Sequence, residues 1–473
     1  MPASRAILAA VLAAALAGCA LKAPPETTEV RKQAMPGVQV PGAWTAAGAA
    51  DGAVAAGWLA GFNDSRLDTL VAEALANNPD LGVAAARVEQ AAAYVKIAGA
   101  TLYPAVQVLG TASGKGGDSG GINFIGLFAN WELDLWGRVR AGREAASNQY
   151  TSAELDLAYA RQSLAAMVAK SWFLASEAHL QGVMAAEMVR SAEKLLELAR
   201  VREKVGNGSA LDTAVAQANL ENYRDAERQL RLAYEQSLRA LELLAGRYPA
   251  AALEAPAALT QLPGPVPAGL PSELLERRPD VVAAERRVAA AFYRVEESKA
   301  AMLPRISLTA GVNALSSDVV VLKERDNPVW GIGGKLAAPI FLGYALQGQV
   351  EVRTAEQKAA IAEYGRIGSR AFGDVESALS AESAARDRQT ILARGVADNQ
   401  RAVELTEVRY RVGSGDLRAV TQQQLALYAT RSALLRVQAE TLVQRVNLYL
   451  ALGGGFGEPL KNSSEGGAPP ATH

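Results

Sequence analysis

The sequence predicts a mainly α-helical protein with a small β part, arranged as two internal repeats. Prolines are absent between Pro104 and Pro249 and again between Pro339 and Pro459. Such gaps permit very long helices, because an interior proline removes a helix hydrogen bond. The 473-residue chain has 50% apolar but only 6% aromatic residues. This composition suits closely packed helices more than a β-sandwich.

Charge and residue counts argue against several classes of function. The 48 Lys and Arg residues nearly balance the 49 Asp and Glu residues, whereas a nucleic-acid binder needs a basic surface to neutralise phosphates. The two histidines are His179 and His473, and the single cysteine is Cys19. These counts argue against a zinc site of Cys and His ligands and against a histidine-activated nucleophile. We therefore expect no catalytic residue, no metal site, no cofactor and no nucleic-acid partner.

The N-terminus resembles a bacterial lipoprotein signal. Arg5 precedes an uncharged apolar run, Ala6–Ala17, which is too short to span a bilayer as a helix. The run ends in Leu16-Ala17-Gly18-Cys19, which resembles a lipobox, the motif whose cysteine becomes the lipidated first residue. We expect a signal peptide over 1–18 and a lipidated segment over 19–63. The alternative is an ordinary secretory signal that contains a cysteine.

Two further features bear on the membrane. In the lipoproteins that this signal resembles, Asp after the cysteine retains the protein in the inner membrane, and Ala20 stands there instead, which favours the outer membrane. Elsewhere the sequence has no run of 18 uncharged apolar residues. A membrane crossing would therefore require the strands of a closed barrel.

Matching motifs at fixed offsets indicate two repeats of about 200 residues. Asn78-Pro79-Asp80 recurs as Arg278-Pro279-Asp280 at an offset of 200 residues. Val205-Gly206-Asn207-Gly208 recurs as Val412-Gly413-Ser414-Gly415 at an offset of 207. At this second offset Gln217 also matches Gln424, and Gly246 matches Gly453.

Each repeat is predicted to contain a helix, two strands, one very long helix, a Gly turn and a second helix. We assign the first repeat to 64–248, a linker to 249–271, the second repeat to 272–453 and a flexible tail to 454–473. The strands are expected at about 104–113 and 122–135, and at about 305–314 and 329–341. A tilted strand of about ten residues can cross a bilayer. The alternation of residues fits a half-buried sheet of a soluble protein equally well.

The helical segments are unusually long. From Gly137 to Val205 there are 69 residues without proline, about 100 Å of helix at roughly 1.5 Å per residue. The last helix shows a heptad pattern typical of coiled-coil packing. Its two seam positions are Leu425, Ser432, Ala439 and Val446, and Tyr428, Leu435, Leu442 and Tyr449. We expect each long helix to pack antiparallel against the helix that follows its Gly turn, near 206–208 and 413–415.

Four strands per chain cannot close a membrane barrel, for which about eight are needed. Two copies would supply eight strands, whose interior fills with side chains, whereas three would supply twelve and leave a pore. Helices in the same ring would continue this pore as a tube. The pattern therefore indicates an oligomeric conduit.

Four segments carry a resemblance to a known family. They are Trp58 to Leu81, Trp131 to Arg138, Pro339 to Gly343, and Asn447 to Gly455. Together they resemble the outer-membrane factors of tripartite efflux pumps, the TolC-like proteins, and particularly their lipoprotein branch, over about residues 50–455. The resemblance implies a homotrimer with a shared twelve-stranded transmembrane β-barrel, a periplasmic α-helical barrel and an equatorial domain.

The same resemblance implies partners and a location. The partners are a periplasmic adaptor (a membrane fusion protein), an inner-membrane pump, often of the resistance-nodulation-division type, and outer-membrane lipid. The location is the bacterial outer membrane, with the helices extending into the periplasm. The family has no catalytic step and needs no cofactor.

The two Gly turns are candidate adaptor contacts. Glycine supplies the positive φ that a tight turn between helices requires, which explains the motif without any partner. The resemblance implies in addition that such tips dock adaptor hairpins. The candidate contact residues are Val205, Gly206, Asn207, Val412, Gly413 and Ser414.

A periplasmic gate is expected beside these turns. Arg409 and Tyr410 match a pair that helps to hold the periplasmic end closed in the family. Asp212, beside the first turn, could accept a hydrogen bond from them, although Ser209-x-x-Asp212 also reads as a helix-capping pattern. Arg418 and Gln422 stand where the family usually has Leu and Asp at its constrictions. Arg418 could instead point out of the tube with its charge in solvent.

We therefore expect a passive duct that exports small molecules such as drugs across the outer membrane and periplasm. The alternative is the outer-membrane duct of a type I protein secretion machine. A structural coiled-coil lipoprotein without a pore is a weaker third reading, because it leaves the four strands unexplained.

Overall fold

The computed structural model describes residues 22–46, 52, 54, 57–111, 122–317 and 329–454. Cys19, the expected signal peptide and the expected tail beyond Gly454 lie outside these residues. The chain divides into two compact units. One comprises residues 1–38, 84–157 and 280–368, and the other comprises residues 39–83, 158–279 and 369–473.

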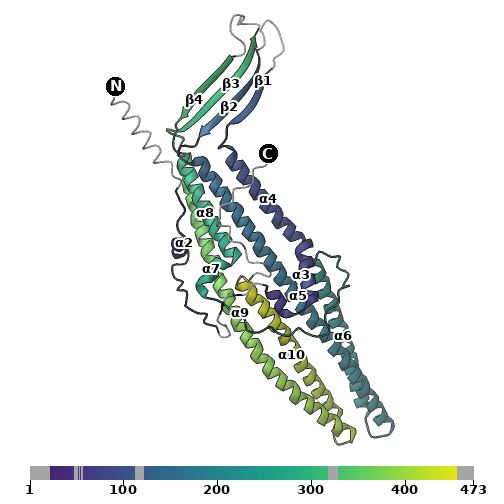
Figure 1. The fold of residues 1–473 in the computed structure, drawn as a ribbon. Coiled ribbons are helices and arrows are strands. Elements are labelled where there is room, and N and C mark those ends of the chain that lie inside the picture. The colour runs from purple at the N-terminus through teal and green to yellow at the C-terminus, as the bar shows by residue number, and fades with distance from the viewer. Residues whose placement is uncertain are drawn as a thin grey trace. The chain divides into compact units, whose positions relative to one another are not determined.

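The elements follow the order expected for a duplicated unit (Figure 1). The N-terminal part contains α2 (Thr27–Ala34), η1 (Trp58–Phe62) and α3 (Ser65–Asn77). The first repeat continues with α4 (Pro79–Ala100), β1 (Ala105–Thr111), β2 (Ile122–Leu133), α5 (Arg138–Lys204) and α6 (Ala210–Leu244). The second contains η2 (Pro271–Glu273), α7 (Leu274–Arg277), α8 (Pro279–Ala300), β3 (Arg305–Ser317), β4 (Val329–Ala337), α9 (Ala345–Arg411) and α10 (Leu417–Ala451).

Corresponding helices of the two repeats have equal lengths. Helices α4 and α8 each have 22 residues, α5 and α9 each have 67, and α6 and α10 each have 35. Helices α5 and α6 form one antiparallel hairpin, and α9 and α10 form the other (Figure 1). The predicted duplication is therefore visible element by element. In the part of the chain described, no helix combines the length and the apolar character that a membrane span requires.

The four strands form one antiparallel sheet in the order β1-β2-β3-β4, so β1 and β4 are its edges. The register places apolar residues of all four strands beside one another on one face. Members of this apolar face include Val106, Val108, Ile125, Leu127, Leu308, Val312, Trp330, Ile332 and Leu336. All nine are exposed, Ile332 to 79%. The opposite face is mostly polar or small, with Gln107, Asn130, Ser307, Thr309, Gly331 and Gly333, and with Leu109 and Phe128 as apolar members.

Two strands end earlier than the sequence pattern predicted. Strand β2 stops at Leu133 rather than near residue 135, because the Asp134 carboxylate accepts hydrogen bonds from the backbone N–H groups of Val139 and Arg140, both at 2.9 Å. These bonds cap the start of α5. Strand β4 stops at Ala337 rather than near residue 341, and Pro339 has no N–H with which to continue a ladder.

Tryptophans reinforce the junction between strands and helices. The Trp131 indole N–H donates to the Leu102 carbonyl at 3.0 Å, and the Trp136 indole N–H donates to the Pro304 carbonyl at 2.7 Å. Arg138 forms a two-pronged ion pair with Glu132. The Trp131–Arg138 motif thus anchors the end of β2, and its contacts form the transition from strand β2 to helix α5.

A contact between the first and last helices closes each repeat. The Asn78 amide donates to the Leu244 carbonyl at the end of α6 (3.0 Å), and the Arg278 guanidinium donates to the Ala451 carbonyl at the end of α10 (3.3 Å). Gly246, which follows α6, has a positive φ of 74°, and a Cβ there would lie 2.7 Å from the Asn77 carbonyl oxygen. Both properties require glycine.

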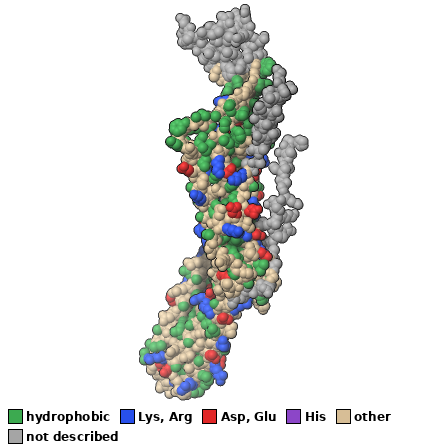
Figure 2. Space-filling model, turned by 90° about the vertical axis from the view of Figure 1, so that its left-hand side faces the viewer, with side chains coloured by type: hydrophobic (Ala, Val, Ile, Leu, Met, Phe, Trp, Pro, Cys, Tyr) green, Lys and Arg blue, Asp and Glu red, His purple; other side chains and the backbone are tan. Residues whose placement is uncertain are grey.

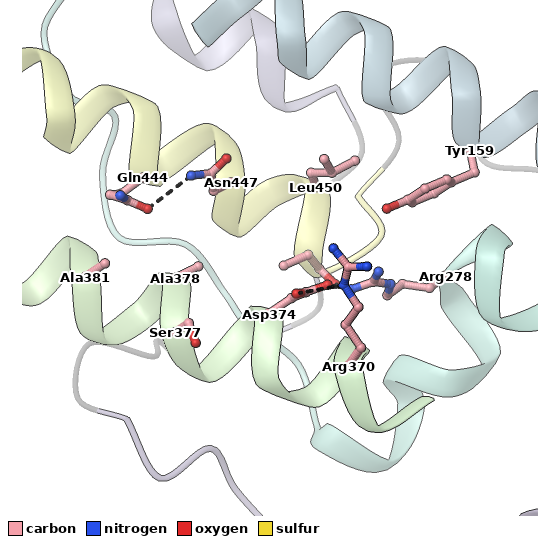
Figure 3. Close-up of a pocket in the computed structure, with 11 residues that line it drawn as sticks. Tyr159, Arg278, Arg370, Asp374, Ser377, Ala378, Ala381, Gln444, Asn447 and Leu450 are labelled. Carbon is pink, nitrogen blue, oxygen red and sulfur yellow. Dashed lines mark hydrogen bonds and ion pairs between the residues drawn. The ribbon is translucent and has the colours of Figure 1, made fainter. Parts of the chain in front are cut away.

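Arg278 also lines a cavity of about 450 Å³ (Figure 3). Its guanidinium forms an ion pair with Asp374 at 3.0 Å and lies 6.0 Å from the centre of the Tyr159 ring. In Figure 3, Arg370 approaches the same carboxylate. The second repeat thus closes with a charged group where the first uses a neutral amide.

The second hairpin contains a buried ion pair where the first is apolar. Arg445 is fully buried and donates to both carboxylate oxygens of Glu382 at 2.9 and 2.6 Å, and to the carbonyls of Pro263 and Gly264. The positions 207 residues earlier are Leu238 and Ala175, which pack together with Ala255. The 249–271 segment thus contacts the second hairpin through two of its carbonyls, and the equivalent positions of the first hairpin contact it by apolar packing on Ala255.

The heptad seam predicted for α10 is correct in its second half and wrong at its start. Leu435, Ala439, Leu442, Val446 and Tyr449 are buried, and Tyr449 stacks on Trp58 with ring centres 5.3 Å apart. Leu425, however, is 53% exposed. Near the turn the buried positions are instead Val420, Gln424 and Leu427, because the helix there packs against the neighbouring hairpin on a rotated face.

Glu242 gives the first prediction. Burial alone would raise the pKa of Glu242, but hydrogen bonds from the backbone N–H groups of Ala251, Ala252 and Leu253 outweigh it, so the pKa lies below its ordinary value of 4.5. A group with a lowered folded pKa stabilises the fold above its unfolded pKa and loses that effect as the pH falls through the folded pKa. We expect Glu242→Gln to reduce the free energy of unfolding by about 1.5–3 kcal/mol at pH 7, with a smaller deficit near pH 4.

Thermal unfolding in detergent, followed by circular dichroism, measures this difference. Glu227→Gln on the same helix is the control, because Glu227 has no hydrogen bond or ion pair within the described residues. The prediction would be contradicted if the loss of unfolding free energy in Glu242→Gln did not change with pH, or if Glu227→Gln lost as much.

Candidate functional site

The tips of the two hairpins have the same backbone geometry. Gly206 and Gly413 have φ of 75° and 83°. The Asn207 N–H donates to the Arg202 carbonyl at 2.8 Å, and the Ser414 N–H donates to the Arg409 carbonyl at 2.9 Å. These bonds satisfy helix carbonyls that would otherwise end unpaired.

Steric contact accounts for the second glycine of each turn. A Cβ on Gly208 would lie 2.9 Å from the Glu203 nitrogen, and a Cβ on Gly415 would lie 3.2 Å from the Arg409 carbonyl carbon. The turn therefore needs one glycine for its φ and another for close approach to the preceding helix.

Side chains cap the helices that leave the turns. The Ser209 hydroxyl accepts from the Asp212 N–H at 3.1 Å, and the Asp416 carboxylate accepts from the Ala419 N–H at 2.7 Å. Ser209 therefore caps α6, as its capping pattern indicated. The two caps stand 207 residues apart, so the turn and its cap were duplicated together.

The tips present matching apolar side chains to solvent. Val205 and Val412 are 62% and 71% exposed, and Val201 and Val408, one helical turn earlier, are about half exposed. Gly206, Asn207, Gly413 and Ser414 are exposed as well. Each tip thus carries the same pair of exposed valines beside a polar turn.

Tyr410 does not lie on the surface of the chain. Its side chain is 2% exposed and packs between the two hairpins with Val189, Ala192, Leu196, Ala199, Ala216, Leu220, Leu417 and Val420. Its hydroxyl has no hydrogen-bond partner. The expected hydrogen bond from Tyr410 to Asp212 is therefore absent, because the ring is held by apolar packing and its hydroxyl does not reach the carboxylate.

Arg202, which the sequence analysis did not single out, holds Tyr410 in place. Its guanidinium carbon lies 4.5 Å from the centre of the Tyr410 ring. The guanidinium also donates to the backbone carbonyls of Tyr410 and, at 2.9 Å, of Asn207. Arg202 is the repeat equivalent of Arg409, so the 207-residue offset was the signal that could have revealed it.

The electrostatics around Tyr410 follow from this arrangement. Burial raises the pKa of the Tyr410 hydroxyl, the Arg202 charge lowers it and the Asp212 charge raises it, with a net increase. The ring therefore stays neutral at physiological pH, and Arg202 interacts with an uncharged aromatic face.

The other expected gate residues lie on the surface of the single chain. Arg409, Arg418 and Gln422 are exposed. Arg409 and Arg418 make no side-chain hydrogen bond or ion pair within the described residues. One chain thus brings together Arg202 and Tyr410, with Asp212 nearby, and leaves Arg409, Arg418 and Gln422 free to meet other surfaces.

Charges of both signs are mixed on one face of the protein (Figure 2). In Figure 2, Lys and Arg side chains are interspersed with Asp and Glu side chains over the face displayed. Among the residues described, no group of three His, Cys, Asp or Glu side chains is arranged to hold a metal ion.

A family model described as outer membrane efflux protein matches residues 70–247 and 270–454, one segment on each repeat. The chain belongs to the outer membrane efflux protein family. The resemblance inferred from the sequence motifs is confirmed. As a member of this family, the chain is the outer-membrane channel component of a tripartite efflux system, and a structural lipoprotein without a pore is ruled out as its function.

Individual relatives cover almost the whole chain of this efflux protein. Cation efflux system protein CusC of Escherichia coli O6:H1 is 31% identical over 460 residues, which are 94% of this chain and 97% of CusC. Pyoverdine export outer membrane protein OpmQ of Pseudomonas aeruginosa is 32% identical over 441 residues, 89% of this chain and 92% of OpmQ. The solved structure of the outer-membrane channel OprN superposes with a TM-score of 0.80 at 25% identity and covers 90% of this chain and 99% of OprN. The predicted TolC-like fold is therefore confirmed.

The Arg202 contact gives the second prediction. Removing the guanidinium in Arg202→Ala eliminates one hydrogen bond and a cation–π contact that join the hairpins, and one hydrogen bond within the first turn. The efflux protein should therefore show a more mobile second tip. We expect faster amide exchange around Tyr410 and a higher single-channel conductance in planar bilayers. Tyr410→Phe should behave like the wild type, because the hydroxyl has no partner to lose.

Arg409→Ala is the matched control for the amide exchange around Tyr410, since it removes the same side chain at the equivalent, exposed position and leaves the Arg202 contact intact. The prediction would be wrong if amide exchange around Tyr410 kept its wild-type rate in Arg202→Ala and became faster in Arg409→Ala. The contacts that hold the tips together would then lie elsewhere.

Proposed function

We propose that three copies of this chain form an outer-membrane export duct. The observation that carries this proposal is the sheet: one face is apolar and exposed on all four strands, and neither edge strand, β1 or β4, has a further partner strand among the residues described. Unpaired edges cannot remain in lipid, because each free backbone group there costs several kcal/mol. Pairing β4 of one copy with β1 of the next satisfies both edges.

The two faces of the sheet suit the two environments of such a barrel. Lipid-facing and lumen-facing residues alternate along transmembrane strands, and here the apolar face would contact lipid while the Gln, Asn, Ser, Thr and Gly face lines water. Three copies supply twelve strands, enough to leave an aqueous pore. A half-buried soluble sheet would instead need a second layer over its apolar face.

The helical tips are proposed to receive the periplasmic adaptor. Val201 and Val205 on one tip repeat as Val408 and Val412 on the other, all at least about half exposed. Duplicated exposed valines beside Gly206, Asn207, Gly413 and Ser414 suit a partner that meets both tips alike. An inner-membrane pump, of the resistance-nodulation-division type, would supply the energy, and the duct itself would be passive.

The closed state is proposed to combine contacts within and between copies. Arg202 and Tyr410 hold the two hairpins of one copy together, and Asp212 lies beside them. The exposed Arg409, Arg418 and Gln422 would meet their counterparts or neighbours around the threefold axis. A ring of Arg418 would favour anions at the constriction.

Small molecules are the proposed cargo. The relatives compared above are named for cations and for pyoverdine, and their names concern small cargo rather than polypeptides. No observation favours the alternative of a protein secretion duct.

Lipid contact gives the third prediction. Ile332→Arg places a charge on the proposed lipid face and should cost about 2–4 kcal/mol if the residue lies near the bilayer midplane. We expect loss of the trimer, which native mass spectrometry in detergent should show for the wild type. Gly331→Arg, on the opposite face with open space around its Cβ position, should still assemble.

The reverse pattern, a trimeric Ile332→Arg variant and an unassembled Gly331→Arg variant, would exclude the assignment of faces. A wild-type chain that stays monomeric would exclude the shared barrel.

Lipidation of Cys19 gives the fourth prediction. Mass spectrometry of the mature N-terminus should find an acylated Cys19 at residue 1 of the processed chain, and Cys19→Ser should remove the modification while trimers persist. An unmodified N-terminus at another residue would contradict it.

A further inference from the structure

A cavity of about 230 Å³ lies between the two hairpins, away from the turns. Helix α5 supplies Met184, Glu187, Met188 and Ser191, α9 supplies Gln400, Val403, Glu404 and Glu407, and α10 supplies Gln424, Leu427, Tyr428 and Arg431. All twelve residues belong to the same compact unit. The cavity is therefore formed by the packing of this chain alone.

The charge of the lining is unbalanced. Three carboxylates, Glu187, Glu404 and Glu407, face one guanidinium, that of Arg431. Within the described residues none of the three carboxylates has an ion-pair partner. Glu407 accepts only from the Gln424 amide at 2.9 Å, and Glu404 only from the Gln400 amide at 3.0 Å.

The first hairpin shows that the fold itself does not require this imbalance. At the offset of 207 residues, Glu407 corresponds to Arg200 and Tyr428 corresponds to Glu221. In the first hairpin, Arg200 donates to Gln217 at 3.0 Å, and Arg224 pairs with Glu193 and Glu221. The second hairpin therefore has the carboxylate of Glu407 where the first has a guanidinium, and the aromatic ring of Tyr428 where the first has a carboxylate.

The remaining lining mixes the neutral polar side chains of Ser191, Gln400 and Gln424 with apolar and aromatic ones. Val403 and Leu427 are buried, and Tyr428 is buried deeply enough to raise the pKa of its hydroxyl. Met184 and Met188 are flexible thioether side chains that accommodate varied shapes. An aromatic face and carboxylates together attract an organic cation, through its charge and through cation–π contact.

We propose that this cavity binds small organic monocations with a flat apolar body. Glu404 and Glu407 provide the charge, Tyr428 provides the aromatic face, and the methionines close around the apolar part. The site needs neither trimer assembly nor opening of the tips, so its test is separate from that of the proposed duct.

Binding of proflavine to the purified full-length protein in a non-ionic detergent tests the proposal. Proflavine is a flat fluorescent monocation at pH 7, and its anisotropy reports binding, while detergent micelles without protein set the background. The neutral tricyclic acridone serves as the uncharged probe. We expect saturable binding of proflavine that weakens with added salt, and much weaker binding of acridone.

The variant Glu404→Gln with Glu407→Gln should raise the Kd for proflavine by about tenfold or more. Glutamine keeps the size of the side chain and can still accept from the neighbouring amides. The matched control is Glu197→Gln. Glu197 is the equivalent of Glu404 on the first hairpin and is exposed like it, but it does not line the cavity, so the variant should leave the Kd unchanged. Tyr428→Leu should weaken the binding of proflavine, and the remaining binding should still decrease with added salt.

Three results would overturn the proposal: proflavine binding no stronger than to empty micelles, equal binding of acridone, or equal effects of the double variant and Glu197→Gln. Circular dichroism of each variant establishes that the helices are intact, so that a lost signal reports the site.

Discussion

The architecture depends on a contact that closes each repeat on itself. Asn78 and Arg278 each precede the proline that begins a helix, and each donates to a carbonyl at the end of the last helix of the same repeat. These contacts join residues 166 and 173 positions apart in the chain. They constrain the lengths of the intervening elements, and corresponding helices in the two repeats have kept equal lengths. Gly246 and Gly453 complete the closure, because only a residue without a side chain fits there with positive φ.

The two repeats kept this frame while their interiors diverged. The buried pair Arg445–Glu382 replaces Leu238 and Ala175. Arg445 binds the linker through the carbonyls of Pro263 and Gly264, whereas the two apolar residues of the first repeat pack against a different linker residue, Ala255. A buried pair of this kind is weak evidence for stability by itself, since desolvation offsets much of the attraction. Its effect here is positional: it determines where residues 263 and 264 lie on the second hairpin. The acidic cavity arose by the same kind of divergence, in which charge was exchanged at positions that the frame leaves free.

Divergence also explains why the tip contacts differ from expectation. Arg202 and Arg409 occupy equivalent positions, yet only Arg202 lies over the buried ring, because the residue after it is Glu203 in one repeat and Tyr410 in the other. A tyrosine that enters the space between the hairpins gains apolar contacts and leaves its hydroxyl unpaired. The contact that joins the tips of one copy therefore comes from the Arg202 guanidinium on the opposite hairpin, which lies over the Tyr410 ring and donates to the Tyr410 carbonyl.

The sequence by itself determined the repeat, the long helices, the Gly turns and the alternating strands, because proline, glycine and apolar periodicity act locally on the backbone. It placed the strand-to-helix motif and the capping residue Ser209 correctly for the same reason. The tertiary structure alone decided that Leu425 faces solvent, that Tyr410 is buried and that Arg202 is its partner. It also decided that apolar residues of four strands share one exposed face. Each of these outcomes depends on the rotation of one helix against another or on the register of one strand against the next. The contact of Arg202 with Tyr410 and the pairing of β2 with β3 join segments more than a hundred residues apart, and local sequence patterns do not encode such packing.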